Sequence, residues 1–423
     1  MKDITPNLSH FILASANSLI KINEGHSIEY ISSWIPENLF PFKKSILSYV
    51  KQSIRNLGCS KAIIKKFINK EPDKLVINIL YVAISLLIES KFQDFTIINQ
   101  AVLATKINKS IFHASGLINA VLRKINQNLE QLKREYYTQS FLPIWWLEKL
   151  KNIDVENYLS ISKLQPAMGL RINPLKISTQ DYFNLLALEN IEARIINLNN
   201  LTPYAIVLPK QIAVEKLPFF SDGYLSVQDI AAQLSPQLLN LKDGDKILDA
   251  CSSPGGKILS CLEQFKLHTT IIDVNSEKID KVFENLDRLK LNHQCLSLNY
   301  HINDASSLHW WNKEQFDYII ADVPCSASGI VRKYPEIALI RQAKDLKNLQ
   351  KLQKDIIQNL WQTLKKSGVL LYITCSVFEE EGIKQIQYFL DKNKDAKCIS
   401  NIGQIEVSLN NDGFFYALLQ KVN

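Results

Sequence analysis

Two cysteines in the C-terminal part of the chain each follow a strand-like segment. Cys325 ends the run Asp322-Val323-Pro324-Cys325 after residues 316–321, and Cys375 stands in Thr374-Cys375-Ser376 after residues 369–373. Open α/β sheets bind ligands at the carboxyl ends of their strands. A lone cysteine is usually a small buried apolar residue. Two at equivalent strand ends, one beside Asp322, instead indicate a site in which a thiolate acts as nucleophile.

A glycine-rich turn precedes both cysteines. The strand-like residues 247–250 run into this turn and then into a helix, and the turn consists of Cys251, Ser252, Ser253, Pro254, Gly255, Gly256 and Lys257. Glycines let the backbone approach a ligand closely, and free N–H groups at a helix start favour electron-rich groups. The glycine spacing matches neither the phosphate-binding loop nor the dinucleotide fingerprint, so the turn alone identifies no ligand.

Two carboxylates follow the next two strand-like segments. Asp273, after residues 269–272, is placed to bind ribose hydroxyls, although an acid at the start of the following helix is an alternative. Asp304, in Asn303-Asp304-Ala305, could accept a hydrogen bond from an adenine amino group. Together with the glycine-rich turn, these positions predict a cofactor site at three successive strand ends.

The elements that must position these residues alternate from Val227 onward. Strands are expected at 246–248, 269–272, 295–298, 318–321 and 369–373, with helices such as 276–289 and 346–364 between them. This alternation predicts an α/β fold with a parallel, doubly wound sheet. The last strand-like runs, 405–408 and 414–419, are joined through Asn411-Asp412-Gly413, which favours an antiparallel hairpin at the sheet edge.

The first 140 residues show a helical pattern, with apolar residues at helical spacing over 42–57, 75–88 and 117–125. Two stretches within them, 42–70 and 95–129, contain no acidic residue. They form either an RNA-phosphate surface or ordinary solvated helix faces. The candidate RNA contacts there are Lys43, Lys44, Lys61, Lys65, Lys66 and Arg123.

A small mixed segment follows a connecting helix that opens at Pro143. Strands are expected at 170–172 and 205–208, with a helix over 181–188 between them. Arg171 and Asn173, at the end of the first of these strands, are further candidate RNA contacts, although ordinary turn residues are an equal alternative.

Bulk properties limit the class of protein. The chain has 423 residues, 46% hydrophobic and 22% charged, with a net charge of +7, which suits a polyanionic partner without identifying one. The longest apolar run, 79–88, is about half of what a membrane-spanning helix needs. The seven cysteines are scattered without metal-ligand spacing. We therefore expect a cytoplasmic protein of two or three domains, with no membrane segment and no metal.

Taken together, the glycine-rich turn, Asp273, Asp304 and the two cysteine motifs resemble the RNA cytosine-5 methyltransferase family, which carries Asp-Pro-Cys (here Asp-Val-Pro-Cys) and Thr-Cys-Ser motifs. Residues 116–123 and 412–417 resemble the Sun/RsmB (Fmu) branch of bacterial 16S rRNA methyltransferases. The resemblance implies a NusB-like RNA-binding domain over 1–140, a connecting helix and small α+β subdomain over 141–225, and a Rossmann-like class I methyltransferase domain over 226–423.

The resemblance also implies the cofactor, the partner and the residue roles. S-adenosylmethionine would bind at the turn 251–257, Asp273, Asp304 and Asp322, and 16S rRNA or an early small-subunit precursor would be modified at the cytosine conventionally numbered 967 by a monomeric enzyme. Cytosine C5 is a poor nucleophile, so a thiolate must first add to C6. By resemblance Cys375 attacks, Cys325 assists release, Asp322 contacts N3 and the exocyclic amine, and Lys257 orients the site. Sequence order alone does not tell which cysteine attacks.

Two alternatives remain open at this point. The same chemistry on tRNA or another rRNA cytosine is one, and a non-catalytic RNA-binding or ribosome-assembly factor on a methyltransferase fold is the other. Retained thiols and carboxylates count against the second, and the helical front favours 16S rRNA. The chain departs from the family at Ser252-Ser253 (usually Ala-Ala), at Ile258 (commonly Thr) and at Ala338-Leu339 (often Lys-Trp), the last a position that bears on target-base packing.

Overall fold

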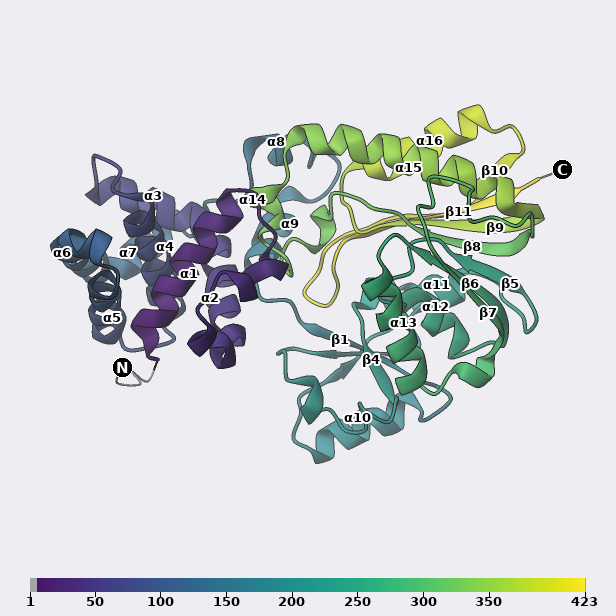
Figure 1. The fold of residues 1–423 in the computed structure, drawn as a ribbon, viewed down its shortest axis with the longest axis horizontal. Helices are drawn as coiled ribbons and strands as arrows, with labels where there is room; N and C mark the ends of the chain where they lie inside the picture. The colour runs from purple at the N-terminus through teal and green to yellow at the C-terminus, as the bar shows by residue number, and fades with distance from the viewer. Residues whose placement is uncertain (1–5, 423) are drawn as a thin grey trace. The chain divides into compact units, whose positions relative to one another are not determined.

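The computed structural model describes residues 6–422, apart from the side chains of Ser400 and Asn401, and it divides into two compact units (Figure 1). The helical unit comprises the chain up to Glu148 together with Ser162–Leu164 and Val331–Gln342. The sheet unit comprises Lys149–Ile161, Gln165–Ile330 and the chain from Ala343 onward. Within residues 6–422 no helix is long and apolar enough to cross a membrane.

The helical unit is built around α4 (Lys74–Glu89), which is buried along almost its whole length. Asp73 caps its start by accepting a hydrogen bond from the Leu75 N–H (2.8 Å), and Ser90 ends it in the left-handed conformation. The predicted helical character of this region is confirmed. The surrounding helices are α1 (Leu8–Asn23), α2 (Lys43–Arg55), α3 (Leu57–Phe67), α5 (Asp94–Ile107), α6 (Ser115–Gln127), α7 (Leu129–Tyr136), α8 (Ile144–Leu147) and α14 (Ile337–Ile340).

Helix α2 binds the backbone of the segment Val331–Gln342 within the helical unit. Arg55, 4% exposed, donates from Nε and Nη2 to the Arg332 carbonyl (3.1 and 2.6 Å), and Lys51 Nζ donates to the Lys333 carbonyl (3.0 Å). Burial lowers the pKa of Arg55 to about 10, against the opposing attraction of Glu336 and Glu89. Two cations of the first acid-free stretch are therefore structural.

The sheet unit contains a small antiparallel sheet of order β2-β3-β1-β4. Helix α9 (Val155–Lys163) precedes it, and α10 (Thr179–Leu188) supplies Tyr182 and Leu186 to its core. The two predicted main strands and the predicted helix are present. The strands are β1 (Met168–Ile172), β2 (Arg194–Ile195), β3 (Ala205–Leu208) and β4 (Leu225–Val227).

The large sheet has seven strands in the order β10-β11-β9-β8-β5-β6-β7. Strands β5 to β9 pair in parallel, and β11 pairs antiparallel with both β9 and β10. The predicted parallel sheet with an antiparallel edge hairpin is confirmed. Its strands are β5 (Lys246–Asp249), β6 (Leu267–Asp273), β7 (Cys295–Ile302), β8 (Phe316–Asp322), β9 (Leu364–Thr374), β10 (Ala396–Ile405) and β11 (Phe414–Lys421).

Helices cover both faces of this sheet (Figure 1). On one face α12 (Gly256–Leu262) and α13 (Ser276–Arg288) pack with Ile247 and Ile271, and on the other α15 (Ala343–Thr363) and α16 (Ile383–Lys392) pack with Leu248 and Leu370. Adjacent residues of one strand thus enter opposite cores, as a doubly wound sheet requires.

One predicted strand is wrong. Residues 405–408 were expected to be extended, but β10 ends at Ile405 and residues 406–413 form the connection to β11. Side chains close this connection, because Ser408 Oγ hydrogen bonds Asn411 Oδ1 (2.5 Å) and Asn411 Nδ2 donates to the Glu406 carbonyl (2.9 Å).

Arg171 and Asn173 are buried, which contradicts the prediction that they contact RNA. They are 2% and 0% exposed, and Arg171 donates to both carboxylate oxygens of Glu263 (2.7 and 2.9 Å) and to the Gly256 carbonyl (2.7 Å). Asn173 donates to the Gly223 carbonyl (3.0 Å) and accepts from the Leu175 N–H (3.0 Å). Asn173 is thus an ordinary turn residue, which was the alternative to RNA contact. Arg171 connects β1 to the glycine-rich turn.

We expect Arg171→Met to lower the free energy of unfolding by about 3–5 kcal/mol, because it leaves Glu263 as a buried charge without its partner. Denaturant unfolding measures this loss, and Lys44→Met, at an exposed position, is the control. The double variant Arg171→Met/Glu263→Met should recover much of the stability. A stability of Arg171→Met equal to that of the control would contradict the structural role.

Candidate functional site

The glycine-rich turn lies between β5 and α12, as its sequence indicates. Gly255 adopts a φ of 91°, and a Cβ there would approach the side chains of Leu259 and Val282 to 2.9 and 3.0 Å. Both the backbone conformation and the space therefore require glycine. The turn packs against β6, since the Ser253 N–H donates to Asp273 Oδ2 (3.2 Å).

Four carboxylates surround Cys251 at the carboxyl edge of the large sheet. Burial raises the pKa of the Cys251 thiol well above its usual value, and the nearby charges of Asp322, Asp249, Asp273 and Asp304 raise it further. Asp273 is 9% exposed, whereas Asp304 is exposed and accepts a hydrogen bond from the Ser306 N–H (2.8 Å). The predicted cofactor residues thus gather around one thiol that stays protonated.

Lys257 forms a half-buried ion pair with Asp322. Their side chains are 11% and 28% exposed, and the Lys257 ammonium also lies 5.8 Å from the centre of the Phe414 ring. Burial acts to lower the pKa of Lys257, but Asp322, Asp249 and Cys375 outweigh it, so the pKa is raised. Lys257 therefore carries its charge next to the second cysteine motif.

The two cysteines of the strand-end motifs lie in contact, with their sulfur atoms 3.3 Å apart and no disulfide between them. The hydrogen bond to Cys375, followed by burial, raises the pKa of Cys325 well above its usual value. Backbone bonds join the loops, because the Gly329 N–H donates to the Cys375 carbonyl (2.9 Å). Cys325 therefore holds its proton and can donate it toward Cys375.

The structure brings together the turn 251–257, Asp273, Asp304, Asp322, Cys325 and Cys375, all within the sheet unit. The candidate cations of the acid-free stretches belong to the helical unit, where Lys44, Lys61, Lys65 and Arg123 are exposed. Lys43 donates to Ser32 Oγ (2.5 Å) and Lys66 pairs with Glu135 (2.8 Å). Their contact with RNA stays a prediction.

Asp249 is a site residue that sequence reasoning missed. It ends β5, is 1% exposed and lies close enough to Lys257 and Asp322 to interact with both charges. Burial raises its pKa to about 7, although Lys257 acts in the opposite direction. The signal was a carboxylate at the end of an apolar strand, directly before the glycine-rich turn.

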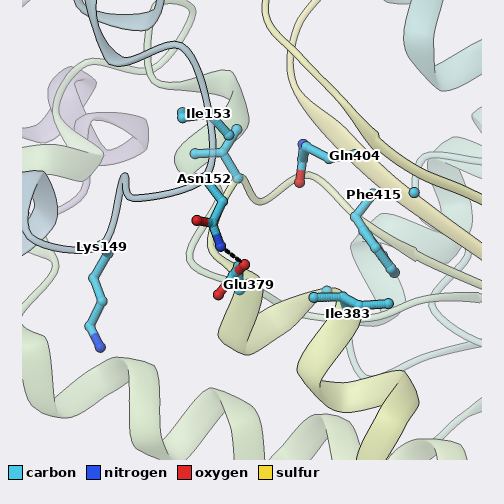
Figure 2. A pocket seen from close by; sticks show the side chains of 10 residues that line it. Lys149, Asn152, Ile153, Glu379, Ile383, Gln404 and Phe415 are labelled. Carbon is cyan, nitrogen blue, oxygen red and sulfur yellow. Dashed lines mark hydrogen bonds between the residues drawn. The ribbon is translucent and has the colours of Figure 1, made fainter.

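A separate pocket of about 210 Å³ opens within the sheet unit beside the turn that follows Cys375 (Figure 2). Asn152 and Glu379 point toward one another there, and the Asn152 amide donates to the Glu379 carboxylate. The pocket is lined by Lys149, Asn152, Ile153, Val377, Glu379, Gly382, Ile383, Gly403, Gln404 and Phe415. Neither Cys325 nor Cys375 lines it.

Comparison with known proteins agrees with this geometry. Residues 236–420 match the family described as 16S rRNA methyltransferase RsmB/F, and residues 142–215 match the ferredoxin-like domain of RsmF/B-like methyltransferases. Ribosomal RNA small subunit methyltransferase B of Pasteurella multocida is 34% identical over all of this chain and 98% of its own length. The chain belongs to the RsmB/F family. The Proteus mirabilis protein of the same name is 36% identical over 76% of this chain and 77% of its own.

Solved structures support the fold of this RsmB/F family member. PH0851 covers 98% of this chain and 99% of its own with a TM-score of 0.74 at 21% identity. A methyltransferase homologue from Pyrococcus horikoshii covers 65% of this chain and 93% of its own, with a TM-score of 0.54 at 23% identity. The predicted Rossmann-like methyltransferase fold and family membership are confirmed.

The environments of the thiols predict an order of alkylation. Only thiolates react readily with iodoacetamide, so a raised pKa slows labelling. Burial raises the pKa of Cys59 to about 11, and the hydrogen bond to Cys375 together with burial raises the pKa of Cys325. We expect Cys375, half-buried beside the Lys257 ammonium, to be labelled before both at mildly alkaline pH, as measured by peptide mass spectrometry. Earlier labelling of Cys325 than of Cys375 would contradict this assignment.

Proposed function

We propose that this RsmB/F family member transfers a methyl group from S-adenosylmethionine to C5 of a cytosine in 16S rRNA, at the position conventionally numbered 967, through a covalent bond between Cys375 and C6. The observation that carries the proposal is the pair of sulfurs 3.3 Å apart, beside the Lys257–Asp322 ion pair at the cofactor edge. The names of the Pasteurella and Proteus relatives support small-subunit rRNA as substrate.

The residues around Cys251 fit S-adenosylmethionine. Asp273 has a carboxylate at the end of β6 for the ribose hydroxyls, and Asp304 lies exposed after β7 for the adenine amine. Asp322, close to Cys251, completes the carboxylate rim near the positively charged sulfonium. When bound, the cofactor supplies an electrophilic methyl group.

The protonation of the two thiols supports Cys375 as the nucleophile. Cys325 keeps its proton, so it stabilises negative charge on the neighbouring sulfur by donating a hydrogen bond. The Lys257 ammonium is close enough to Cys375 to interact electrostatically with it. Both contacts would stabilise negative charge on the Cys375 sulfur during attack and release. This argument is independent of the family resemblance and gives the same order.

The steps follow from these positions. The Cys375 sulfur bonds C6 of a flipped or single-stranded cytosine, and the proton that the thiol loses passes through water to N3. Asp322 accepts hydrogen bonds from that N3–H and from the exocyclic amine. C5 then attacks the methyl group, whose bond to the cofactor sulfur breaks, so that S-adenosylhomocysteine leaves. A water molecule takes the proton from C5, whose electron pair restores the C5–C6 double bond as the sulfur–C6 bond breaks. The departing sulfur regains its proton from N3 through water. Cys325 donates its S–H hydrogen bond to the departing Cys375 sulfur. Lys257 holds Asp322 in place through their ion pair.

The helical unit is proposed to bind RNA through its exposed cations. Lys44, Lys61, Lys65 and Arg123 are exposed and lie in the two acid-free stretches. Phosphate contacts of this kind supply affinity without choosing the base. Of the alternatives, methylation of tRNA or another rRNA cytosine differs only in the RNA, whereas a non-catalytic factor would not require two thiols in contact.

Replacing each of the two cysteines by alanine and assaying the variants on defined RNAs tests the reaction and its target together. With unmodified 16S rRNA and S-adenosylmethionine, bisulfite mapping should show methylation at position 967 for the native protein. Cys375→Ala should abolish both methylation and any covalent adduct, because nothing attacks C6. Cys325→Ala should lose turnover and accumulate a protein–RNA adduct that survives denaturing gels.

Cys398→Ala serves as the control, because it removes a cysteine of β10 that lies outside the two cysteine motifs. An adduct trapped by Cys375→Ala and absent from Cys325→Ala would reverse the roles. Full activity in both variants would exclude covalent catalysis. Parallel assays on tRNA and on assembled small subunits separate the alternative substrates.

Cofactor binding gives an independent prediction. Asp273→Ala should weaken S-adenosylmethionine binding by roughly 1–3 kcal/mol, the range for lost charge-assisted hydrogen bonds. Calorimetry with the native protein, Asp273→Ala and Asp304→Ala measures the change, and Asp280→Ala, an exposed carboxylate on α13, is the control. Unchanged affinity in both test variants would place the cofactor elsewhere.

A further inference from the structure

Three consecutive glutamates follow the Cys375 motif, and their carboxylates have different partners. Glu379 accepts from Asn152 at the pocket of Figure 2 and pairs with Lys384 (3.0 Å). Glu380 pairs with Lys149 (2.6 Å). Glu381 is fully buried, with 0% exposure, and is the one of the three that contacts the Cys325 loop.

Glu381 joins the two thiol loops through backbone and side-chain bonds. Its Oε1 accepts from the N–H of Ser326 (2.8 Å), the residue after Cys325, and from Gln353 Nε2 (3.1 Å) on α15. Its carbonyl accepts from the Tyr372 hydroxyl (2.9 Å) on β9. One residue thus contacts the Cys325 loop, helix α15 and the strand that leads to Cys375.

A ring of three serine hydroxyls reinforces this junction. The oxygens of Ser326 and Ser376 are 3.2 Å apart, those of Ser328 and Ser376 are 3.0 Å apart, and those of Ser326 and Ser328 are 3.1 Å apart. All three residues are at most 2% exposed. Ser328 Oγ also accepts from the Val377 N–H (2.9 Å). Each thiol is therefore followed directly by a serine that bonds the opposite loop.

We propose that Glu381 is a positioning residue that, with the ring of Ser326, Ser328 and Ser376, holds the Cys325 and Cys375 sulfurs in contact. The inference rests on the proposed function in one respect: a thiol that assists release must lie in contact with the attacking sulfur. Burying a carboxylate is costly unless hydrogen bonds compensate for it, and burial indeed raises the pKa of Glu381. Such a group, bonded to both loops, fixes their separation more firmly than an apolar side chain would.

The test measures sulfur contact without methyl transfer. Diamide accepts the two electrons and two protons released when two thiols form a disulfide, and peptide mass spectrometry then quantifies the Cys325–Cys375 disulfide over time. We expect Glu381→Ala to slow its formation by about fivefold to tenfold, the population change that one lost buried hydrogen bond produces. Glu381→Gln, which keeps an oxygen acceptor for the Ser326 N–H, should recover most of the native rate.

Glu380→Ala is the matched control, since it removes the adjacent carboxylate and its Lys149 pair but no contact of the thiol loops. It should form the disulfide at the native rate. If Glu381→Ala does not fold, Ser328→Ala replaces it, because that change removes the bond to the Val377 N–H and two edges of the serine ring. A native disulfide rate in the folded Glu381 or Ser328 variant would overturn the proposal.

Methylation assays on the same variants separate this inference from the proposed function. A slow disulfide together with slow methylation and unchanged S-adenosylmethionine affinity supports positioning. A slow disulfide with native methylation leaves positioning intact and counts against the two-thiol mechanism. A native disulfide rate with lost methylation overturns positioning, because the sulfurs then remain in contact without Glu381.

Discussion

The positive charge of Lys257 offsets the negative charges of the carboxylates at the carboxyl edge of the large sheet, and the arrangement of the site depends on it. Lys257 lies against Asp322 and interacts with Asp249 and Cys375, in surroundings where little water screens the charges. Without that ammonium, the carboxylates of Asp249 and Asp322 would repel one another at neighbouring strand ends. Burial already raises the pKa of Asp249 to about 7, and the Lys257 charge acts against that rise. The glycine-rich turn exists in this form partly because it must deliver Lys257 to this place.

Much of the fold was predictable because its signals are local. Runs of apolar residues identified β5 to β9, and an all-helical pattern identified the front of the chain. The error at residues 405–408 has a local cause as well, since Ser408 and Asn411 close the connection with side-chain bonds that hydrophobic patterning does not register. The boundary of β10 therefore depended on turn chemistry and not on strand propensity.

The residues of the site likewise fall into those with a local sequence signal and those without one. Cys325, Cys375, Asp322 and the turn 251–257 carry motifs, so the sequence identifies them. The prediction that Arg171 contacts RNA is wrong because its partner Glu263 lies 92 residues away in the chain. The residues next to Arg171 in the sequence do not reveal this buried ion pair. Glu381 was missed for the related reason that three adjacent glutamates suggest a solvated turn. Only the tertiary structure shows that one of them faces inward.

The path of the chain connects the helical unit with the Cys325 loop. The Cys325 loop continues through Ile330, and the next residues, Val331–Gln342, belong to the helical unit, where Arg55 and Lys51 bind the carbonyls of Arg332 and Lys333. The chain then returns to the sheet unit at α15, whose Gln353 donates to Glu381. Both ends of the segment therefore lead to residues that hold the thiol loops. The acid-free stretch 42–70 therefore binds the polypeptide that directly follows the Cys325 loop.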